Sequence, residues 1–170
     1  MPHIMKKGFL IIALSALAFV ACNTDTVVSP SAQLSSSHYR TYTVPDVLGQ
    51  DSLVRDTITF GDTVRIGDTV RVPILCNGYY NYLRSVITTA DTTKMLVSLL
   101  WNDEFRSSLA DDADPAHGRL TFLADKVYAC YTTIVYVPKM SGTHRLDILL
   151  TSSAKEGYSD GAWHFFVPVK

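Results

Sequence analysis

The sequence has no long hydrophobic run and no dense basic segment. Its longest apolar stretch, residues 8–21, is only 14 residues long, whereas a helix needs about 20 residues to cross the hydrocarbon of a bilayer. This stretch therefore does not predict a membrane span. Lysine and arginine are scattered along the chain, and nucleic-acid-binding domains usually cluster them on one surface. The sequence thus argues against nucleic acid as a partner.

The common catalytic motifs are also missing. The chain has no serine nucleophile elbow, no zinc-binding His-Glu-x-x-His, no Cys-x-x-Cys and no phosphate-binding glycine loop. We therefore expect a protein that needs no cofactor and is not an enzyme. A less favoured hypothesis is an enzyme or an inhibitor, which would use loop residues such as Asp112 and His117.

Cysteine occurs only at positions 22, 76 and 130. Cys76 and Cys130 have two interpretations. They form a disulfide, which persists in an exported protein, or they are two small buried hydrophobic residues. A bridge across their 54-residue separation would stabilise the fold by about 4 kcal/mol.

The start of the chain predicts export. Lys6 and Lys7 precede the apolar run, which ends directly before Cys22, and this order is typical of a secretory signal. Residues 19–22, Phe-Val-Ala-Cys, resemble the bacterial lipobox, although Leu is more usual than Phe at the first position. The resemblance implies a signal peptide at 1–21, acylation of Cys22 and anchoring in the bacterial cell envelope, with the outer membrane as the expected location.

The mature chain of 149 residues carries 13 basic and 16 acidic side chains, and its length is that of one ordinary domain. Residues 22–50 contain Ser-Pro-Ser and Ser-Ser-Ser segments with little apolar periodicity, which predicts a flexible tether. From residue 51 onward, short runs of Val, Ile, Thr, Tyr and Phe are separated by Gly, Asp, Asn and Pro. This pattern predicts an all-β domain over 51–170.

Residues 56–73 contain three copies of a six-residue repeat that begins with Asp-Thr. An even period keeps equivalent positions on one face of an extended strand. We therefore expect six apolar side chains to point inward: Ile58, Phe60, Val64, Ile66, Val70 and Val72. Gly-Asp pairs at 61–62 and 67–68 predict turns between the copies.

Further strands are predicted near residues 71–76, 82–89, 94–101, 119–123, 128–137, 143–151 and 162–169. In the last of these, every second residue is apolar, and Pro168 indicates an edge strand. Residues 134–150 form an apolar strand that turns at Pro and Gly into another, and they resemble the paired late strands of immunoglobulin-like domains. The resemblance implies an antiparallel β-sandwich of about seven to nine strands.

Aromatic and amide side chains cluster at two places. Tyr79, Tyr80 and Tyr82 lie close together in the sequence, and Trp101 is followed by Asn102. A flat ring covers the apolar face of a sugar while neighbouring polar groups bond its hydroxyls. These five residues are therefore the candidate glycan site. The same composition is also typical of an ordinary strand end.

Acidic residues gather at Asp111, Asp112 and Asp114. Calcium takes about six to eight oxygen ligands, and closely spaced carboxylates supply several of them. These three residues are therefore candidate metal ligands. The alternative is a solvated acidic turn, since their spacing is not that of an EF-hand.

Asp followed by Ser or Thr and then by Thr or an apolar residue occurs at six places, with Thr26 and Ser52 as the acceptors least expected to lie in a sheet. These triplets resemble the O-glycosylation sequon of Bacteroidetes, whose secreted lipoproteins the whole chain resembles. Turn chemistry followed by strand-forming residues produces the same triplets.

The sequence favours a membrane-anchored, extracytoplasmic, non-catalytic module that binds or adheres to a glycan or a surface protein. The alternative is a structural or accessory subunit of a cell-envelope or fimbrial assembly. Such a subunit would offer an edge strand, such as residues 162–169, to its partner.

Overall fold

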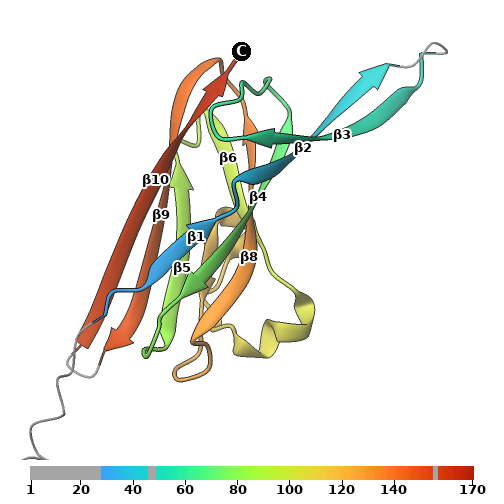
Figure 1. The fold of residues 1–170 in the computed structure, drawn as a ribbon. Helices are drawn as coiled ribbons and strands as arrows, with labels where there is room; N and C mark the ends of the chain where they lie inside the picture. Colours follow the sequence, from blue (N-terminus) through green and yellow to red (C-terminus); the bar gives the residue numbers. More distant parts are fainter. Residues whose placement is uncertain (1–27, 46–48, 155–156) are drawn as a thin grey trace, which may run out of the picture.

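The computed structural model describes residues 28–45, 49–154 and 157–170. Cys22 and the predicted signal peptide lie outside these residues. The described residues form ten β-strands and two short 3-10 helices (Figure 1). The strands are β1 (Ser31–Leu34), β2 (Ser37–Pro45), β3 (Asp51–Thr59), β4 (Thr69–Asn77), β5 (Leu83–Ala90), β6 (Met95–Leu100), β7 (Arg119–Thr121), β8 (Ala129–Pro138), β9 (Gly142–Ala154) and β10 (Gly157–Val169). The helices are η1 (Asp103–Ser108) and η2 (Pro115–His117), and no helix in the described part of the chain is long and apolar enough to cross a membrane.

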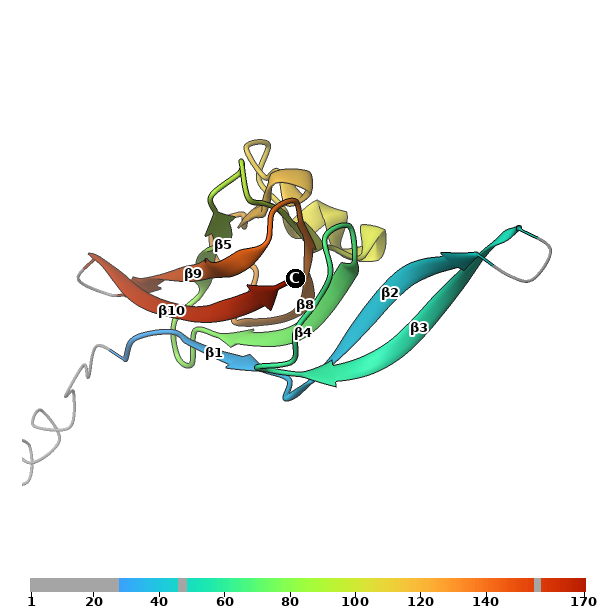
Figure 2. The same ribbon diagram turned by 90° about the horizontal axis from the view of Figure 1, so that it is seen from above.

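The strands form two antiparallel sheets, which confirms the predicted all-β fold. The first sheet has the order β3-β2-β4-β8-β6, with β1 paired to β4 beside β2, and the second has the order β10-β9-β5-β7. Seen from above, the two sheets lie on either side of a common core (Figure 2). The ten strands exceed the predicted seven to nine, because strands also form upstream of residue 51.

The prediction of a flexible tether up to residue 50 is wrong for residues 31–45, which form β1 and β2. Ser31 pairs with Asn77 and Leu34 pairs with Ile74, so β1 is an integral strand of the first sheet. Ala32 and Leu34 pack against the core, and His38 in β2 is buried. The folded domain therefore begins well before residue 51.

The core follows from the two-residue period of the strands. In β4, Val70, Val72, Ile74 and Cys76 are all fully buried, and the second sheet contributes Leu146, Ile148 and Leu150 from β9. Their outward neighbours on β4 are half-buried or exposed. Burial of alternate residues on both sheets thus produces one continuous hydrophobic cluster.

The two junctions between copies of the repeat build the same tight turn. At the first junction, the Asp62 N–H donates to the Thr59 carbonyl at 3.2 Å, and the Asp62 carboxylate accepts from the Thr59 N–H at 2.7 Å. At the second junction, the Asp68 N–H donates to the Arg65 carbonyl at 3.1 Å, and the Asp68 carboxylate accepts from the Arg65 N–H at 2.8 Å. The repeat therefore encodes turns as well as strands.

These turns correct part of the predicted inward face. Gly61 and Gly67 have φ values of +95° and +86°, which glycine tolerates at the third position of a turn. Phe60 and Ile66 precede them at the second position and are 43% and 53% exposed. The prediction of an inward side chain is therefore wrong for Ile66. Phe60 is only half-buried, with its ring against His38 and Phe165, whereas Ile58, Val64, Val70 and Val72 are buried.

The C-terminal strand β10 is an edge strand of the second sheet, as Pro168 indicated. Its residues Val167 and Val169 are buried, and Trp163 and Phe165 pack against the core. The edge is closed at its end, because the Val64 N–H donates to the Pro168 carbonyl at 3.0 Å and the Lys170 N–H donates to the Val64 carbonyl at 3.0 Å.

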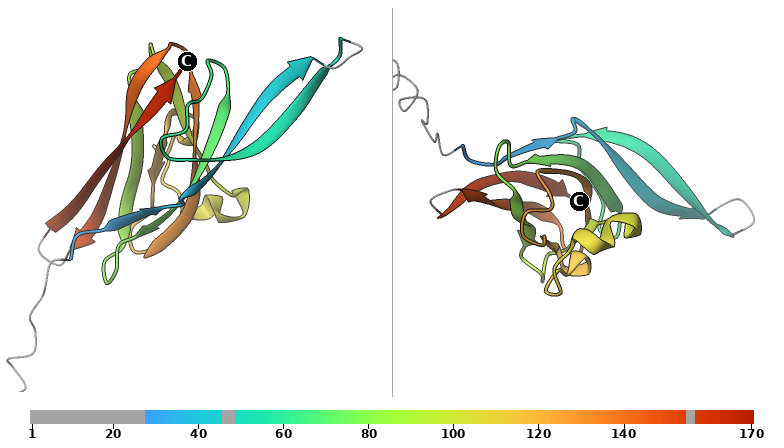
Figure 3. Two further views of the ribbon diagram at one scale, coloured as in Figure 1. Left: turned by 45° about the horizontal axis from the view of Figure 1, so that its top comes forward. Right: turned by 90° about the horizontal axis from the view of Figure 1, so that it is seen from below.

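Strands β2 and β3 extend beyond the sandwich as a two-stranded ribbon (Figures 1 and 3). We call residues 42–45 and 51–54 the arm. β2 pairs with β4 only through residues 39–41, so the arm has no further β-partner among the described residues. The exposed fraction of Leu53 on the arm is 76%.

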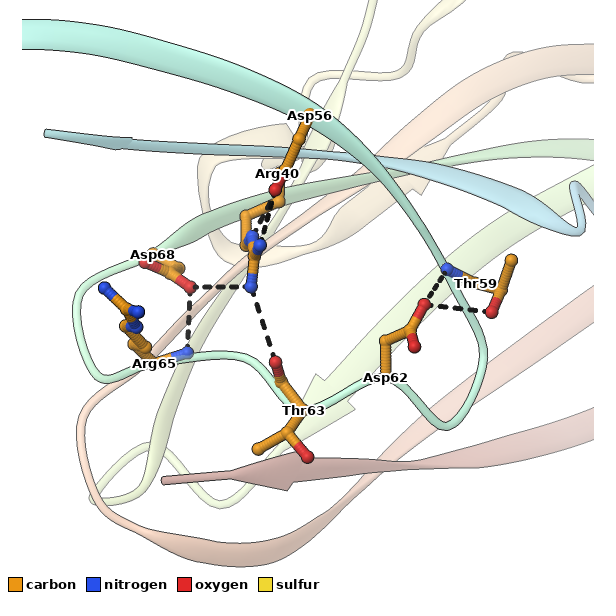
Figure 4. A network of polar contacts seen from close by, with 7 residues as sticks. All are labelled: Arg40, Asp56, Thr59, Asp62, Thr63, Arg65 and Asp68. Atoms are coloured by element: carbon orange, nitrogen blue, oxygen red, sulfur yellow. Dashed lines mark hydrogen bonds and ion pairs between the residues drawn. The ribbon is translucent and has the colours of Figure 1, made fainter.

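The base of the arm is fixed by a polar network around Arg40 (Figure 4). Its Nε donates to Asp56 Oδ1 at 3.0 Å, and its Nη1 lies 3.8 Å from Asp68 Oδ2 and donates to the Thr63 carbonyl at 3.4 Å. The network joins β2 and β3 to both turns of the repeat. Asp56 and Asp68 begin the first and third copies of that repeat and Thr63 lies in the second, so Arg40 contacts all three copies.

Candidate functional site

Most exposed aromatic side chains of the loops gather at one end of the sandwich. This end is formed by the β4–β5 loop, by η1 and by the β7–β8 loop. Two backbone bonds hold the first and last of these together, because Gly78 N–H donates to the Tyr128 carbonyl at 2.8 Å and Leu83 N–H donates to the Val127 carbonyl at 2.6 Å. We call it the aromatic end and define it by Tyr79, Tyr80, Tyr82, Trp101, Phe105, Tyr128 and Tyr131.

A groove with a volume of about 670 Å³ lies at this end. We call it the aromatic groove, and its walls are Trp101, Asn102, Phe105, Ser108, Lys126, Val127, Tyr128, Ala129, Cys130 and Tyr131. Its size is within the range of about 300–1,000 Å³ that is common for small-ligand sites. Two of its wall residues, Trp101 and Asn102, belong to the predicted glycan site.

Trp101 forms the inner wall of the groove. Its ring centroid lies 5.5 Å from that of the buried Phe122 and 6.5 Å from that of Phe105. The indole Nε1 is buried and has no hydrogen-bond partner. Because the ring packs on the core as well as on the groove, Trp101 has a structural role beside any role in binding.

Asn102 has a local role as the N-cap of η1. Its Oδ1 accepts from the Glu104 N–H at 3.1 Å, and its Nδ2 donates to Glu104 Oε2 at 3.2 Å. An N-cap of this kind satisfies a backbone donor that the first helical turn leaves free. The cap thereby fixes the start of η1, which presents Phe105 to the groove.

Tyr82 does not line the groove but contacts Tyr128, which does. It stacks on Tyr128 with the ring centroids 3.9 Å apart and the planes 26° from parallel. The hydrogen bond between the two phenols raises the pKa of Tyr82. Tyr82 thus supports a wall of the groove without lining it.

Tyr79 and Tyr80 do not line the groove. They are 47% and 88% exposed at the tip of the β4–β5 loop. Asn77 Oδ1 accepts from the Tyr79 N–H at 2.6 Å, and Tyr79 has φ +56°. Both rings therefore lie outside the groove, and the structure separates them from Trp101 and Asn102.

Sequence reasoning missed the other groove residues, among them the three aromatic ones and the cation: Phe105, Tyr128, Tyr131 and Lys126. One signal for Tyr131 was present, since the inward alternation of Cys130, Thr132 and Ile134 places position 131 on the outer face. The exposed fraction of Tyr131 is 68%.

The acidic loop does not form the predicted metal site. Among the residues that the structure describes, no three His, Cys, Asp or Glu side chains converge on a common point. Asp114 caps η2 and accepts from His117 Nδ1 at 2.8 Å, whereas Asp112 accepts from Thr121 Oγ1 at 3.3 Å. Asp111 is exposed. Asp112 and Asp114 therefore make contacts within the loop and do not converge with Asp111 on a shared ion, and His117 pairs with Asp114 and not with Asp112.

Cys76 and Cys130 are directly opposite each other on the neighbouring strands β4 and β8. Both are buried and both are free thiols. The contact with the Cys130 thiol, followed by burial, raises the pKa of Cys76. The structure thus has the two sulfurs side by side as small core residues, with Cys130 also reaching the wall of the groove.

The Asp-Ser/Thr triplets show turn chemistry at three of their described positions. Besides Asp62 and Asp68, Asp91 accepts from the Thr93 N–H and hydroxyl at 3.0 and 2.6 Å. Ser52 is exposed but belongs to β3 in the arm, and Thr26 lies outside the described residues. Glycosylation at these sites stays a prediction.

No protein-family model matches the chain, and no curated protein matches it significantly.

Proposed function

We propose that this chain is a lipid-anchored, extracytoplasmic module of a bacterial cell envelope that binds a saccharide in the aromatic groove and does not catalyse a reaction. The observation that supports the proposal is the groove itself. Phe105 and Tyr131 expose 58% and 68% of their surface and line a groove that Lys126 and Asn102 also line. Apolar rings beside polar groups are suited to the two kinds of surface that a sugar presents.

The ammonium group of Lys126 further specifies the ligand. A cation on the groove wall favours a saccharide with a carboxylate or phosphate over a neutral one. The lipid anchor is supported by Lys6, Lys7 and the lipobox-like residues 19–22. Several acyl chains on Cys22 would give stable attachment, which one chain alone does not. We propose that the lipid on Cys22 anchors the protein in the outer membrane.

The test is a fluorescence titration of a chain that starts at residue 23 and retains every described residue. The titrants are neutral oligosaccharides and matched ones that carry uronic acids, and the signal is tryptophan emission, because Trp101 lines the groove. Tyr131→Ala should weaken binding at least about tenfold. Because the side chain is mostly exposed, the free energy of unfolding should change by less than about 0.5 kcal/mol.

Leu53→Ala is the matched control, since Leu53 is also apolar and exposed but lies on the arm. It should leave the dissociation constant unchanged. Saturable binding that Tyr131→Ala does not weaken would place the site elsewhere. Absence of binding across both sets would overturn the saccharide proposal. Trp101→Ala is a poor probe, because loss of its contact with Phe122 is expected to destabilise the fold by about 3 kcal/mol.

A second candidate function, as a structural or accessory subunit of an envelope assembly, is supported by the arm. An isolated two-stranded ribbon is only marginally stable in water, and an unpaired strand edge can take up a strand from a partner. β10, the predicted edge, is less suited because Val64 closes its end. Concentration-dependent association in sedimentation equilibrium, abolished by Leu53→Asp, would support this function, whereas a monomer at all concentrations would count against it.

A further inference from the structure

The first described residues of the chain lie at the aromatic end. β1 runs antiparallel to β4, so Ser31 at the start of β1 pairs with Asn77 at the end of β4. Upstream of β1, the Val28 carbonyl accepts from Asn81 Nδ2 at 3.3 Å. Asn81 belongs to the same loop as Tyr79 and Tyr80. In Figure 1, β1 begins near the lower end of the sandwich, whereas the arm extends away toward the upper right.

The length of chain before Val28 limits how far this end can be from an anchor at Cys22. Val28 is the sixth residue after Cys22, and six fully extended residues span at most about 20 Å. A lipid on Cys22 therefore keeps Val28, at the aromatic end, within about 20 Å of the membrane surface. The arm is not constrained in this way, because β2 pairs with residues 69–71 at the start of β4, whereas β1 pairs with residues 74–77 at its end.

The side chains at the aromatic end suit a membrane interface. Tyr80 is 88% exposed, and Tyr79, Phe105, Tyr128 and Tyr131 are between 47% and 68% exposed. Aromatic rings with a polar tip are favoured at the level of the lipid headgroups. This chemistry explains why a large ring stands exposed at the tip of the β4–β5 loop, where it neither lines the groove nor packs on the core.

The charges at this end select the kind of surface. Asp103, Glu104 and Asp125 are exposed there beside Lys126 and Arg106. The acidic and basic side chains nearly balance, so this end as a whole has no net attraction for an anionic surface, and the contact that fits it is with zwitterionic headgroups.

We propose that the aromatic end lies against the membrane that holds the lipid of Cys22, with Tyr79 and Tyr80 in contact with zwitterionic headgroups and the arm projecting away. The proposal rests on the anchor in the proposed function and adds the orientation of the domain.

The test compares two labelled variants of the full lipidated chain, Tyr80→Cys and Leu53→Cys. Both positions are exposed, at 88% and 76%, and they lie at opposite ends of the molecule. An environment-sensitive maleimide dye labels them selectively, because acylation blocks Cys22 and because Cys76 and Cys130 are buried. The proteins are reconstituted in phosphatidylcholine vesicles that contain a headgroup spin-labelled lipid as quencher.

We expect the dye at position 80 to be quenched at least about threefold more than the dye at position 53, and its emission to shift to the blue. Equal quenching at the two positions, or stronger quenching at position 53, overturns the orientation while leaving the anchor intact. Mass spectrometry of the same sample tests the anchor separately. A chain without lipid on Cys22 overturns the anchor, and with it the orientation that depends on it.

Discussion

Arg40 in β2 and Asp56 in β3 form a bidentate ion pair at the base of the arm. Nε and Nη2 of the guanidinium group donate to the two different carboxylate oxygens of Asp56. The hydrogen bond to Asp56 raises the pKa of Arg40, and the same bond lowers the pKa of the Asp56 carboxyl. The pair is only partly exposed, with 19% of the arginine side chain and 35% of the aspartate side chain accessible.

Arg40→Met should lower the free energy of unfolding by about 2 kcal/mol, because it leaves the nearly buried Asp68 carboxylate without its cation. Only 5% of the Asp68 side chain is exposed. Urea unfolding followed by circular dichroism measures the change. Arg55→Met is the matched control, since Arg55 is exposed and lies 4.2 Å over the Tyr39 ring, a contact worth about 0.5–1 kcal/mol. Equal losses in the two variants would contradict the role of the network.

Acidification should destabilise the fold over the pH range in which His38 becomes protonated in the unfolded chain. Burial lowers the pKa of His38 from its ordinary value of 6.5, so the unfolded chain binds this proton more readily than the folded chain. The free energy of unfolding should therefore fall as the pH drops below about 6.5 and should be fully retained above it. Thermal unfolding at several pH values between 5 and 8 measures this slope.

The control variant for this pH range is His38→Gln, whose amide N–H can still donate to the Ser35 carbonyl, 2.9 Å from His38 Nε2 in the native chain. It should flatten the slope between pH 5 and 7. A slope that persists unchanged in the variant would assign the effect to another group. Asp56, Asp62 and Asp91 do not contribute in this range, because their lowered pKa values place their loss of stability below pH 3.8.

Cys76 and Cys130 should be unreactive in the native state. Thiol reagents attack the thiolate, and the contact between the sulfurs together with burial disfavours that form at Cys76. In a chain that starts at residue 23, a thiol-reactive dye should label neither residue in buffer and both in concentrated guanidinium chloride. Rapid labelling in buffer would contradict the burial. No labelling in guanidinium chloride would show that the pair had formed a disulfide before purification.

The strands from residue 69 onward could be predicted because burial on one face imposes a two-residue alternation, as Val70, Val72 and Ile74 show. The strands at 31–45 could not. Their Ser- and Thr-rich composition is shared by linkers and by strands near a sheet edge, and the pairing that decides between them involves β4, more than 40 residues downstream in the register Ser31 to Asn77. Local composition contains no information on such a distant partner.

The candidate site also has residues that local sequence predicts and residues that only the fold brings together. Trp101 and Asn102 are adjacent in the sequence and were predicted together. Tyr128 and Tyr131 join them only because β8 lies beside β6 in the first sheet. Tyr79, which lies outside the groove, has a positive φ in the β4–β5 loop, and a side chain other than glycine gives little warning of such a conformation.

Gly118 should be far less replaceable than Gly67, although both have positive φ values of +78° and +86°. A Cβ at Gly118 would lie 2.4 Å from the Thr88 carbonyl oxygen and 2.7 Å from Thr88 Oγ1, whereas a Cβ at Gly67 would meet nothing within 4 Å. Gly67→Ala should therefore cost only the left-handed backbone, about 1–2 kcal/mol. Gly118→Ala must also displace the backbone of β5, and the free energy of unfolding should fall by about 3 kcal/mol or more.

Urea unfolding of the two alanine variants separates the cost of the left-handed backbone from the cost of the steric overlap, since the first is common to both variants and the second belongs to Gly118 alone. The Thr88 N–H donates to the Gly118 carbonyl at 2.7 Å, so displacement at this point also weakens the bond that holds η2 against β5. Equal losses for the two variants would mean that the loop after η2 moves aside without strain. A larger loss for Gly118→Ala would show that this glycine fixes the path of the acidic loop, where Asp112 and Asp114 were predicted to bind a metal.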